Sequence, residues 1–272
     1  MSIEAELDFE RRFGGVRRLY GDAALQRFRQ AHVCVIGVGG VGSWAVEALA
    51  RNAIGQLTLI DLDNIAESNV NRQLHAVEGA FGMAKVSAMA QRVRQINPLA
   101  QVHEIEDFIT PDNLDAMLNR GYDAVLDAID DARAKTALAA WCRRHKLPLV
   151  MAGGAGGRFD PTRLRVGDLS EVQGDRLLAK VRNQLRRDHG FPKAGNQGSA
   201  SAKKTAKFGI PCIYSDEPVQ QPETVSCETD NAITGLNCAG YGSTVTVTAP
   251  SGMAAAGLVL KLLAQQAGQA KA

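Results

Sequence analysis

The feature that most constrains this chain is an apolar run that ends in a glycine-rich turn and leads directly into a helix-forming segment. Residues 32–36, HVCVI, are almost wholly apolar, which predicts a strand buried on both faces. The turn at 37–42 reads G-V-G-G-V-G, and apolar side chains then recur at helical spacing up to Gly55. A strand, a glycine turn and a helix in this order predict a nucleotide-binding unit.

The same alternation continues through the N-terminal half. Repeated strand and helix patterns predict an α/β fold, with a Rossmann-like, mainly parallel sheet that is covered by helices on both faces. Ligands of such sheets bind beyond the carboxyl ends of the strands. The expected further strands are 57–61, 101–106, 123–128 and 147–153, and the expected further helices are 82–96, 111–118 and 132–145.

The pattern predicts three parts of the chain. Residues 1–30 form an N-terminal arm, basic at first and then helical, and residues 31–165 form the nucleotide domain. Residues 166–272 form a smaller C-terminal extension, with a basic helix at 172–187, a flexible tract at 190–207 and a final segment. A strand expected at 163–169 spans the boundary between the two parts. Within that final segment, β-branched residues at 243–249 favour a strand locally.

Composition excludes several classes of protein. The 272 residues can bury a substantial core, and the net charge of +2 is too small to indicate a nucleic-acid or membrane partner by itself. The five cysteines include no C-x-x-C pair, so neither a disulfide framework nor zinc is expected, and a reducing, cytoplasmic setting fits best. No histidine pair has metal-ligand spacing.

Targeting and membrane signals are weak. The N-terminus MSIEAELDFERRF has no apolar core and is therefore not a secretory signal. The apolar stretch 238–264 is rich in Gly, Ser and Thr and is interrupted by Pro250, so it is more typical of a buried core helix than of a membrane span. Membrane attachment is therefore not expected.

The glycine turn and the strand after it specify the kind of ligand. The backbone N–H groups of the turn, together with the positive end of the following helix, suit phosphate groups. Asp61 closes the second expected strand, where a carboxylate can accept hydrogen bonds from ribose hydroxyls. These features alone also fit an NAD-dependent dehydrogenase. The glycines concerned are Gly37, Gly39, Gly40 and Gly42.

The residues that follow favour ATP over NAD. Asn69, Arg72 and Lys85 add a carboxamide and two cations near the phosphate end of the site, and hydride transfer does not need those cations. Departure of pyrophosphate does need them, because negative charge develops on the bridging oxygen. Asp130, just past the fourth expected strand, is a candidate ligand for a Mg²⁺ ion that arrives with ATP.

These motifs together resemble the ubiquitin-activating superfamily of adenylyltransferases over roughly residues 10–160. The resemblance implies that Asp61 and Asp63 contact ribose and metal, and that Asp130 coordinates Mg²⁺. It also implies that Asn69, Arg72 and Lys85 engage the triphosphate. The motifs that carry it are G-x-G-G-x-G, the D-x-D at 61–63, N-x-N-R-Q at 69–73, Lys85 and L-D-A-I-D-D at 126–131.

The resemblance also implies a homodimer. In this superfamily an arginine of the partner subunit reaches ATP, and the matching segment here is R-F-G-G-x-x-R-L-Y-G at 12–21. Arg18 is the first candidate for that arginine, with Arg12 or Arg17 as alternatives. The superfamily further favours a helix, against the local strand preference, for residues 243–249.

Within the superfamily the chain most resembles the branch that dehydrates threonylcarbamoyladenosine in tRNA. The chain has neither paired zinc cysteines nor room for a thioester domain, and the branch is matched by 12–21, 110–113 and 142–162. The resemblance implies that ATP activates the threonyl carboxylate as an acyl-adenylate. The ureido oxygen then attacks it and expels AMP, which leaves a cyclic oxazolone.

An RNA substrate gives the basic C-terminal residues a use in phosphate contact. A sulfur-transfer protein is a further candidate partner, whereas Cys238 is interpreted as a packing residue. Three alternatives stay open: activation of the carboxyl terminus of a ubiquitin-like or sulfur-carrier protein, an NAD-binding oxidoreductase or sensor, and a non-enzymatic RNA-binding scaffold. The basic residues are Arg176, Lys180, Arg182, Arg186 and Arg187, with lysines at 193, 203, 204 and 207.

Overall fold

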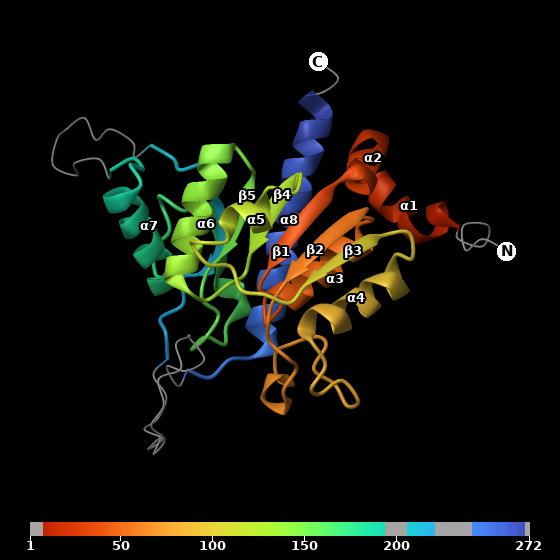
Figure 1. Cartoon of the computed structure of the whole chain (residues 1–272), viewed down its shortest axis with the longest axis horizontal. Coiled ribbons are helices and arrows are strands. Elements are labelled where there is room, and N and C mark those ends of the chain that lie inside the picture. The colour runs from red at the N-terminus through yellow and green to blue at the C-terminus, as the bar shows by residue number, and fades with distance from the viewer. Residues whose placement is uncertain (1–7, 194–205, 221–240, 270–272) are drawn as a thin grey trace.

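The computed structural model describes residues 8–193, 206–220 and 241–269. Its centre is a seven-stranded sheet with the strand order β3-β2-β1-β4-β5-β7-β6 (Figure 1). Every neighbouring pair in the sheet is parallel except β6 and β7, which are antiparallel. The predicted α/β, Rossmann-like and mainly parallel sheet is confirmed.

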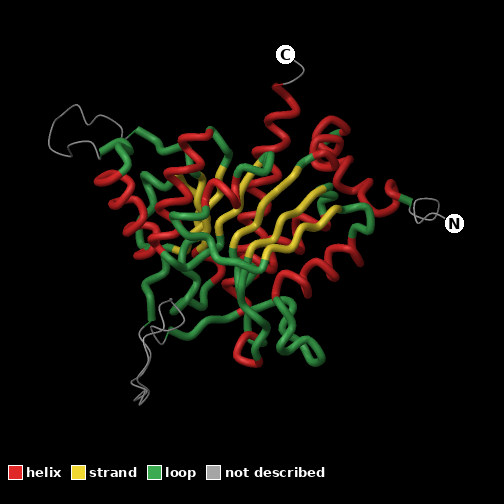
Figure 2. The backbone as a smooth tube through the Cα atoms, in the orientation of Figure 1, coloured by secondary structure: helices red, strands yellow, loops and turns green. Residues whose placement is uncertain are grey.

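The strands are short and alternate with helices along the chain until β5. Figure 2 shows the strands in yellow between the helices in red. The strands are β1 His32–Ile36, β2 Gln56–Ile60, β3 Gln101–Ile105, β4 Ala124–Asp127, β5 Leu149–Ala152, β6 Leu164–Asp168 and β7 Pro211–Ser215. The helices are α1 Phe9–Tyr20, α2 Asp22–Gln30, α3 Gly42–Arg51, α4 Lys85–Ile96, α5 Leu114–Leu118, α6 Ala132–His145, α7 Arg176–Asp188 and α8 Val245–Gln269, with single 3₁₀ turns at Glu67–Asn69 and Pro161–Arg163.

Helices cover both faces of the sheet and create two separate cores. Helices α2, α3, α4 and α8 pack on one face, where Phe28, Leu49 and Leu59 are fully buried. Helices α5, α6 and α7 pack on the other face, around Leu138, Val181 and Met151. Burial on both faces explains why β1, β2, β4 and β5 are continuous apolar runs.

Residues 9–20 and 22–30 of the N-terminal arm form two helices, which corrects the expectation of a basic stretch before one short helix. Gly14 and Gly15 argue against a helix locally, but Asp8 caps α1, because its side chain accepts from the Arg11 amide. Phe13 is buried against Leu25 of α2. This apolar contact outweighs the low helix propensity of the two glycines.

Residues 245–249 belong to helix α8. Of the strand and the helix considered for this stretch, the helix is therefore the one observed. Helix α8 packs against α3 so closely that a Cβ on Gly252 would lie 2.3 Å from the Val41 carbonyl oxygen. This packing overrides the strand preference of the β-branched residues. The helix is long and apolar enough to cross a membrane by length and composition, and half of that stretch is buried inside the protein.

The C-terminal part contributes to the same sheet as the nucleotide half. Strand β7 inserts between β5 and β6, although no strand was expected at its position from the sequence. Pro211 opens β7, and the strand is one residue longer than β5. The division at residues 30 and 165 stays a prediction. Most of the expected flexible tract, with the lysines at 203 and 204, lies outside the described residues, as does Cys238.

Candidate active site

A cavity of about 430 Å³ lies at the carboxyl ends of the central strands. Residues that follow five different elements line it: the glycine turn after β1, Asp61 after β2, Phe108 after β3, Asp130 after β4 and Gly153 after β5. Thr248 at the start of α8 closes one side. This is the position at which open α/β sheets bind ligands.

The glycine turn has two positions that only glycine can occupy. Gly37 has a φ of 81°, and a Cβ there would lie 2.9 Å from the Ala128 carbonyl oxygen. A Cβ on Gly42 would lie 1.8 Å from the Gly37 carbonyl oxygen, so the start of α3 can sit directly on the turn. Gly39 and Gly40 line the cavity. Helix α3 has no side-chain cap hydrogen bond at its N-terminus, and its amide groups suit an anion.

Asp61 ties the turn to the second strand. Its carboxylate accepts a 2.6 Å hydrogen bond from the Val38 amide and a 2.9 Å bond from the Asp63 amide. Burial raises the pKa of Asp61, against the opposing effect of Lys85 and these two amides. The carboxylate is therefore fixed on the cavity wall, where it can accept from a ligand hydroxyl.

Lys85 and Asp63 form an ion pair at the same wall. The Lys85 ammonium lies 2.7 Å from Asp63 Oδ2, and the Lys85 side chain is 7% exposed, whereas that of Asp63 is 57% exposed. Lys85 is the first residue of α4, and its amide donates to the Asp63 carbonyl oxygen. Both side chains line the cavity, so the ammonium is held at its edge.

Arg72 contributes a second cation. It donates to the Ser68 carbonyl oxygen at 2.7 Å and to Asn71 Oδ1 at 3.0 Å, and burial lowers its pKa. The Arg72 carbonyl oxygen accepts from Trp44 Nε1 and from Thr248 Oγ1. The segment that carries the guanidinium is thus fastened to α3 and α8 through its backbone.

Asn69 does not line the cavity. It is buried, and its amide oxygen accepts from the Ala66 amide at 3.0 Å, which closes the 3₁₀ turn Glu67–Asn69. The residue that does line the cavity beside Arg72 is Gln73. A direct contact between Asn69 and ATP stays a prediction.

Asp130 stands on a loop that a buried ion pair supports. The loop residues Ala128 to Asp131 all line the cavity. Beneath them, the Lys135 ammonium lies 3.0 Å from Asp127 Oδ1, and both side chains are 0% exposed. The same Asp127 oxygen accepts from the Ile129 amide, and burial raises the pKa of Asp127. Asp131 then caps α6 by accepting from the Ala134 amide.

The glycine-rich loop after β5 forms the far wall. The Gly154 amide donates to Asp175 at 2.9 Å, and Asp175 also caps α7 by accepting from the Leu178 amide. Arg158, almost fully buried, donates to the Ser215 and Gly174 carbonyl oxygens. A Cβ on Gly153 would lie 2.3 Å from Asp175 Oδ2, so this loop needs glycine at that position.

Sequence reasoning missed three parts of the site. Phe108 lines the cavity and is 53% exposed, and Thr248 approaches from a helix far along the chain. One feature of the sequence could have indicated the pair of Asp127 and Lys135, because Lys135 is at an inward-facing position of the predicted helix 132–145. No group of three or more His, Cys, Asp or Glu side chains suited to a metal occurs in the described part of the chain.

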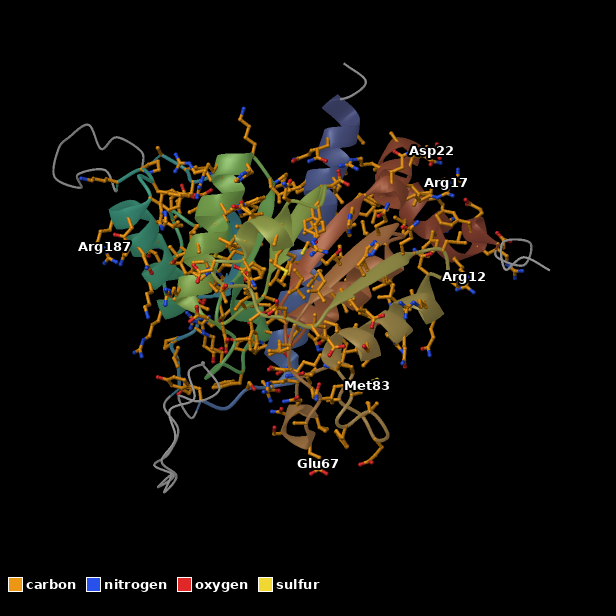
Figure 3. All side chains as sticks on the ribbon, in the orientation of Figure 1. Arg12, Arg17, Asp22, Glu67, Met83 and Arg187 are labelled. Carbon is orange, nitrogen blue, oxygen red and sulfur yellow. The ribbon has the colours of Figure 1, made fainter. Side chains whose placement is uncertain are left out.

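Arg18 lies far from the cavity of its own chain. Helix α1 precedes β1 and sits by the amino ends of the strands. In Figure 3, Arg12 and Arg17 are well separated from Glu67 and Met83, which lie on the segment between the cavity-lining residues Asp63 and Lys85. Arg12 donates to the Ile96 carbonyl oxygen, and Arg17 pairs with Glu10 and Asp22. Among the described residues, no hydrogen bond or ion pair engages the exposed Arg18 side chain.

His75, buried next to this site, gives the protein an expected acid sensitivity. Neither ring nitrogen has a partner among the described residues, and burial, then Lys85, lowers its pKa to about 4. A histidine whose pKa is depressed on folding stabilises the native state above its unfolded pKa of about 6.5, and this stability is lost as the pH falls toward 4.

We expect the free energy of unfolding to drop between pH 7 and pH 4.5 by about 2 kcal/mol more in the wild type than in His75→Phe. Urea titrations at each pH measure this, with the exposed His189→Asn as the matched control. Parallel curves for the wild type and His75→Phe would show that His75 does not titrate in this way.

The family model described as the ThiF family matches residues 14–271. The chain belongs to the ThiF family. It is 46% identical over 266 residues to the tRNA threonylcarbamoyladenosine dehydratase of Haemophilus influenzae, covering 97% of both chains. It is 44% identical over 273 residues to the Escherichia coli enzyme of the same name, covering 98% of both.

Solved structures agree with this membership of the ThiF family. The crystal structure of the E. coli tRNA N6-threonylcarbamoyladenosine dehydratase in complex with ATP matches with a TM-score of 0.83 at 44% identity, over 96% of this chain and 97% of that one. The complex of that enzyme with AMP matches with a TM-score of 0.84 at 43% identity. The resemblance inferred from the sequence is confirmed.

Proposed function

We propose that this protein is an ATP-dependent tRNA threonylcarbamoyladenosine dehydratase. The observation that carries the proposal is the cavity itself, which gathers a glycine turn, a ribose-type carboxylate and two cations at the carboxyl ends of the strands. Identity of 44% to 46% over nearly the full length of relatives with that name supports the same activity here.

In the reaction, the threonyl carboxylate of the modified adenosine attacks the α-phosphorus of ATP, and pyrophosphate leaves. The ureido oxygen then attacks the activated carbonyl carbon, AMP leaves, and an oxazolone ring closes. The substrate loses the elements of one water. Since both reacting groups belong to one substituent, the second step is intramolecular and needs no covalent enzyme intermediate.

Each wall of the cavity has a role in this proposal. Gly37, Gly39 and Gly40 of the turn line the space for the phosphates, and Gly42 lets α3 begin directly on the turn. Asp61 accepts from the ribose hydroxyls. Arg72 and Lys85 stabilise the charge that develops on departing pyrophosphate. Because Lys85 already pairs with Asp63, the phosphates compete with that carboxylate for the ammonium.

Mg²⁺ fits the donor set of the cavity. Asp130 and Asp131 line it with carboxylate oxygens, and Mg²⁺ in nucleotide sites is held by one or two carboxylates plus phosphate oxygens. When bound, the ion would neutralise negative charge on the phosphates. In this proposal Asp130 holds it, and the loop above Asp127 keeps Asp130 in place.

The proposed enzyme is a cytoplasmic homodimer in which Arg18 enters the partner's site. The separation of Arg18 from its own cavity and its lack of a described partner support this role over Arg12 and Arg17. A sulfur-transfer protein stays a candidate partner from the sequence.

Mixing two inactive variants tests the homodimer. In a mixed dimer of Arg18→Ala and Arg72→Ala, one of the two sites combines an intact Arg72 with an intact partner Arg18. After subunit exchange, about a quarter of the wild-type activity is expected to return, because half of the dimers are mixed. Unchanged inactivity would place Arg18 outside the partner's site.

Formation of AMP tests the proposed function against its nearest rival. We expect ATP to be converted to AMP and pyrophosphate only when tRNA that carries threonylcarbamoyladenosine is present. Pyrophosphate exchange that depends instead on a ubiquitin-like or sulfur-carrier protein would favour activation of a protein carboxylate. NAD binding in preference to ATP would favour the oxidoreductase.

A further inference from the structure

Two helices lead away from the cavity on one face of the sheet. Helix α6 begins beside it, because Asp131 and Ala134 line the cavity. Helix α7 begins there too, because its capping residue Asp175 accepts from the Gly154 amide of the cavity wall. The helices pack together, with Thr136 near Gln184, and the 14 residues of α6 span about 21 Å.

The outer surface of these helices carries cations from the cavity to the far end. We call it the α6–α7 basic face. No hydrogen bond or ion pair within the described ranges engages the side chains of Arg133, Arg144, Arg176 or Lys180, all of which are exposed. The face comprises Arg133, Arg143, Arg144, Lys146, Arg176, Lys180 and Arg187.

Of the α7 cations predicted on the sequence alone to contact RNA, only Arg182 and Arg186 do not belong to this face. Arg182 donates to the Val172 carbonyl oxygen, and Arg186 donates to the Pro192 carbonyl oxygen, so both fasten the ends of α7 to neighbouring backbone. Arg187, at the outer end of α7 in Figure 3, pairs with Asp188. Arg143 lies over the Phe191 ring at 4.1 Å, which fixes its guanidinium at the surface.

The carboxylates near this face are already engaged. Asp131 and Asp175 cap the two helices, and Asp188 pairs with Arg187. On the opposite face of the sheet several cations are paired with carboxylates: Arg51 and Arg92 pair with Glu47, and Arg94 pairs with Glu104. The α6–α7 side, by contrast, presents four exposed cations without an ion pair among the described residues.

We propose that the α6–α7 basic face holds the phosphate backbone of the tRNA while the modified nucleotide occupies the cavity. This inference rests on the proposed function, since it names the surface on which that RNA substrate lies. A row of solvated cations that extends about 20 Å from the reacting group suits a polyanion that continues beyond the nucleotide in the cavity. Such contacts position the RNA without reading its sequence.

A matched pair of double variants tests the proposal. Arg144→Gln with Lys180→Gln removes two positive charges from the basic face, and Arg94→Gln with Lys261→Gln removes two from the opposite face. The Kd for tRNA carrying threonylcarbamoyladenosine is measured over a series of salt concentrations. The Kd for ATP and the thermal unfolding midpoint are measured in parallel.

The basic-face variant is expected to bind this tRNA about tenfold more weakly, with a salt dependence reduced by about one to two ions. Its affinity for ATP and its rate of AMP formation at saturating tRNA should match the wild type. The opposite-face variant should bind tRNA within about twofold of the wild type.

Equally weakened tRNA binding in both variants would mean that only net charge matters. Unchanged tRNA binding in both would mean that the RNA lies elsewhere. Each of these results overturns the proposal. Failure of the proposed function is recognised separately. In that case the wild-type protein itself binds ATP but forms no AMP with the modified tRNA.

Discussion

Replacing Arg72 by alanine is expected to lower kcat/KM for tRNA dehydration by about 10²- to 10³-fold. The guanidinium lines the cavity beside Gly40 and is partly buried, so its charge acts in a medium less polar than water. Pyrophosphate gains negative charge as it leaves, and alanine has no positive charge to stabilise it. A KM for ATP that rises while kcat is unchanged would contradict a role in the transition state.

The fold should survive this change. The hydrogen bonds that fasten the segment to α3 and α8 use the Arg72 carbonyl oxygen, which alanine keeps. The hydrogen bonds that the side chain loses, to Ser68 and Asn71, are at the surface. The free energy of unfolding should therefore change by no more than about 1 kcal/mol. Arg94→Ala, an exposed arginine on α4, is the control and should retain full activity.

Replacing Lys135 by methionine is expected to lower the free energy of unfolding by about 3 to 5 kcal/mol. Methionine fills much the same space, but it leaves Asp127 as a buried carboxylate without its cation. Burial already raises the pKa of Asp127, so loss of the ammonium favours the protonated carboxyl group. Urea denaturation measures the loss, with the exposed Lys261→Met as control.

A second variant distinguishes the charge from the shape of this site. Lys135→Met combined with Asp127→Leu removes both charges and should recover most of the lost stability, because two apolar groups replace the pair. The double variant still loses the bond from the Ile129 amide to Asp127, so the loop that carries Asp130 should bind ATP·Mg²⁺ more weakly. If Lys135→Met unfolds like the wild type, the pair does not support the fold.

The nucleotide half could be predicted because its signals are local. The turn from Gly37 to Gly42 combines steric demands that only glycine meets, and helix α6 was predicted with its observed bounds from apolar spacing alone. The cavity brings Arg72, Lys85 and Asp130 together, as expected for residues that follow parallel strands on either side of β1. Their individual roles remain predictions.

The features that sequence reasoning missed depend on long-range packing. Strand β7 is five residues long, and its place between β5 and β6 depends on partners far away in the chain. Helix formation over 245–249 was not missed, because the superfamily resemblance favoured it, but the local β-branched pattern left it open; Gly252 approaches α3 closely there. Likewise, only the fold reveals that Arg182 and Arg186 bond to backbone while Arg144 of another helix is exposed.

The central claim is tested most directly by mass spectrometry of nucleosides from tRNA that carries threonylcarbamoyladenosine, after incubation with the protein and ATP·Mg²⁺. Digestion must be mild, since the oxazolone ring is readily hydrolysed. We predict a nucleoside lighter by one water with the wild-type protein and ATP, and none without ATP or with Arg72→Ala. An unchanged nucleoside in every reaction, from protein that binds ATP, would contradict the proposed function.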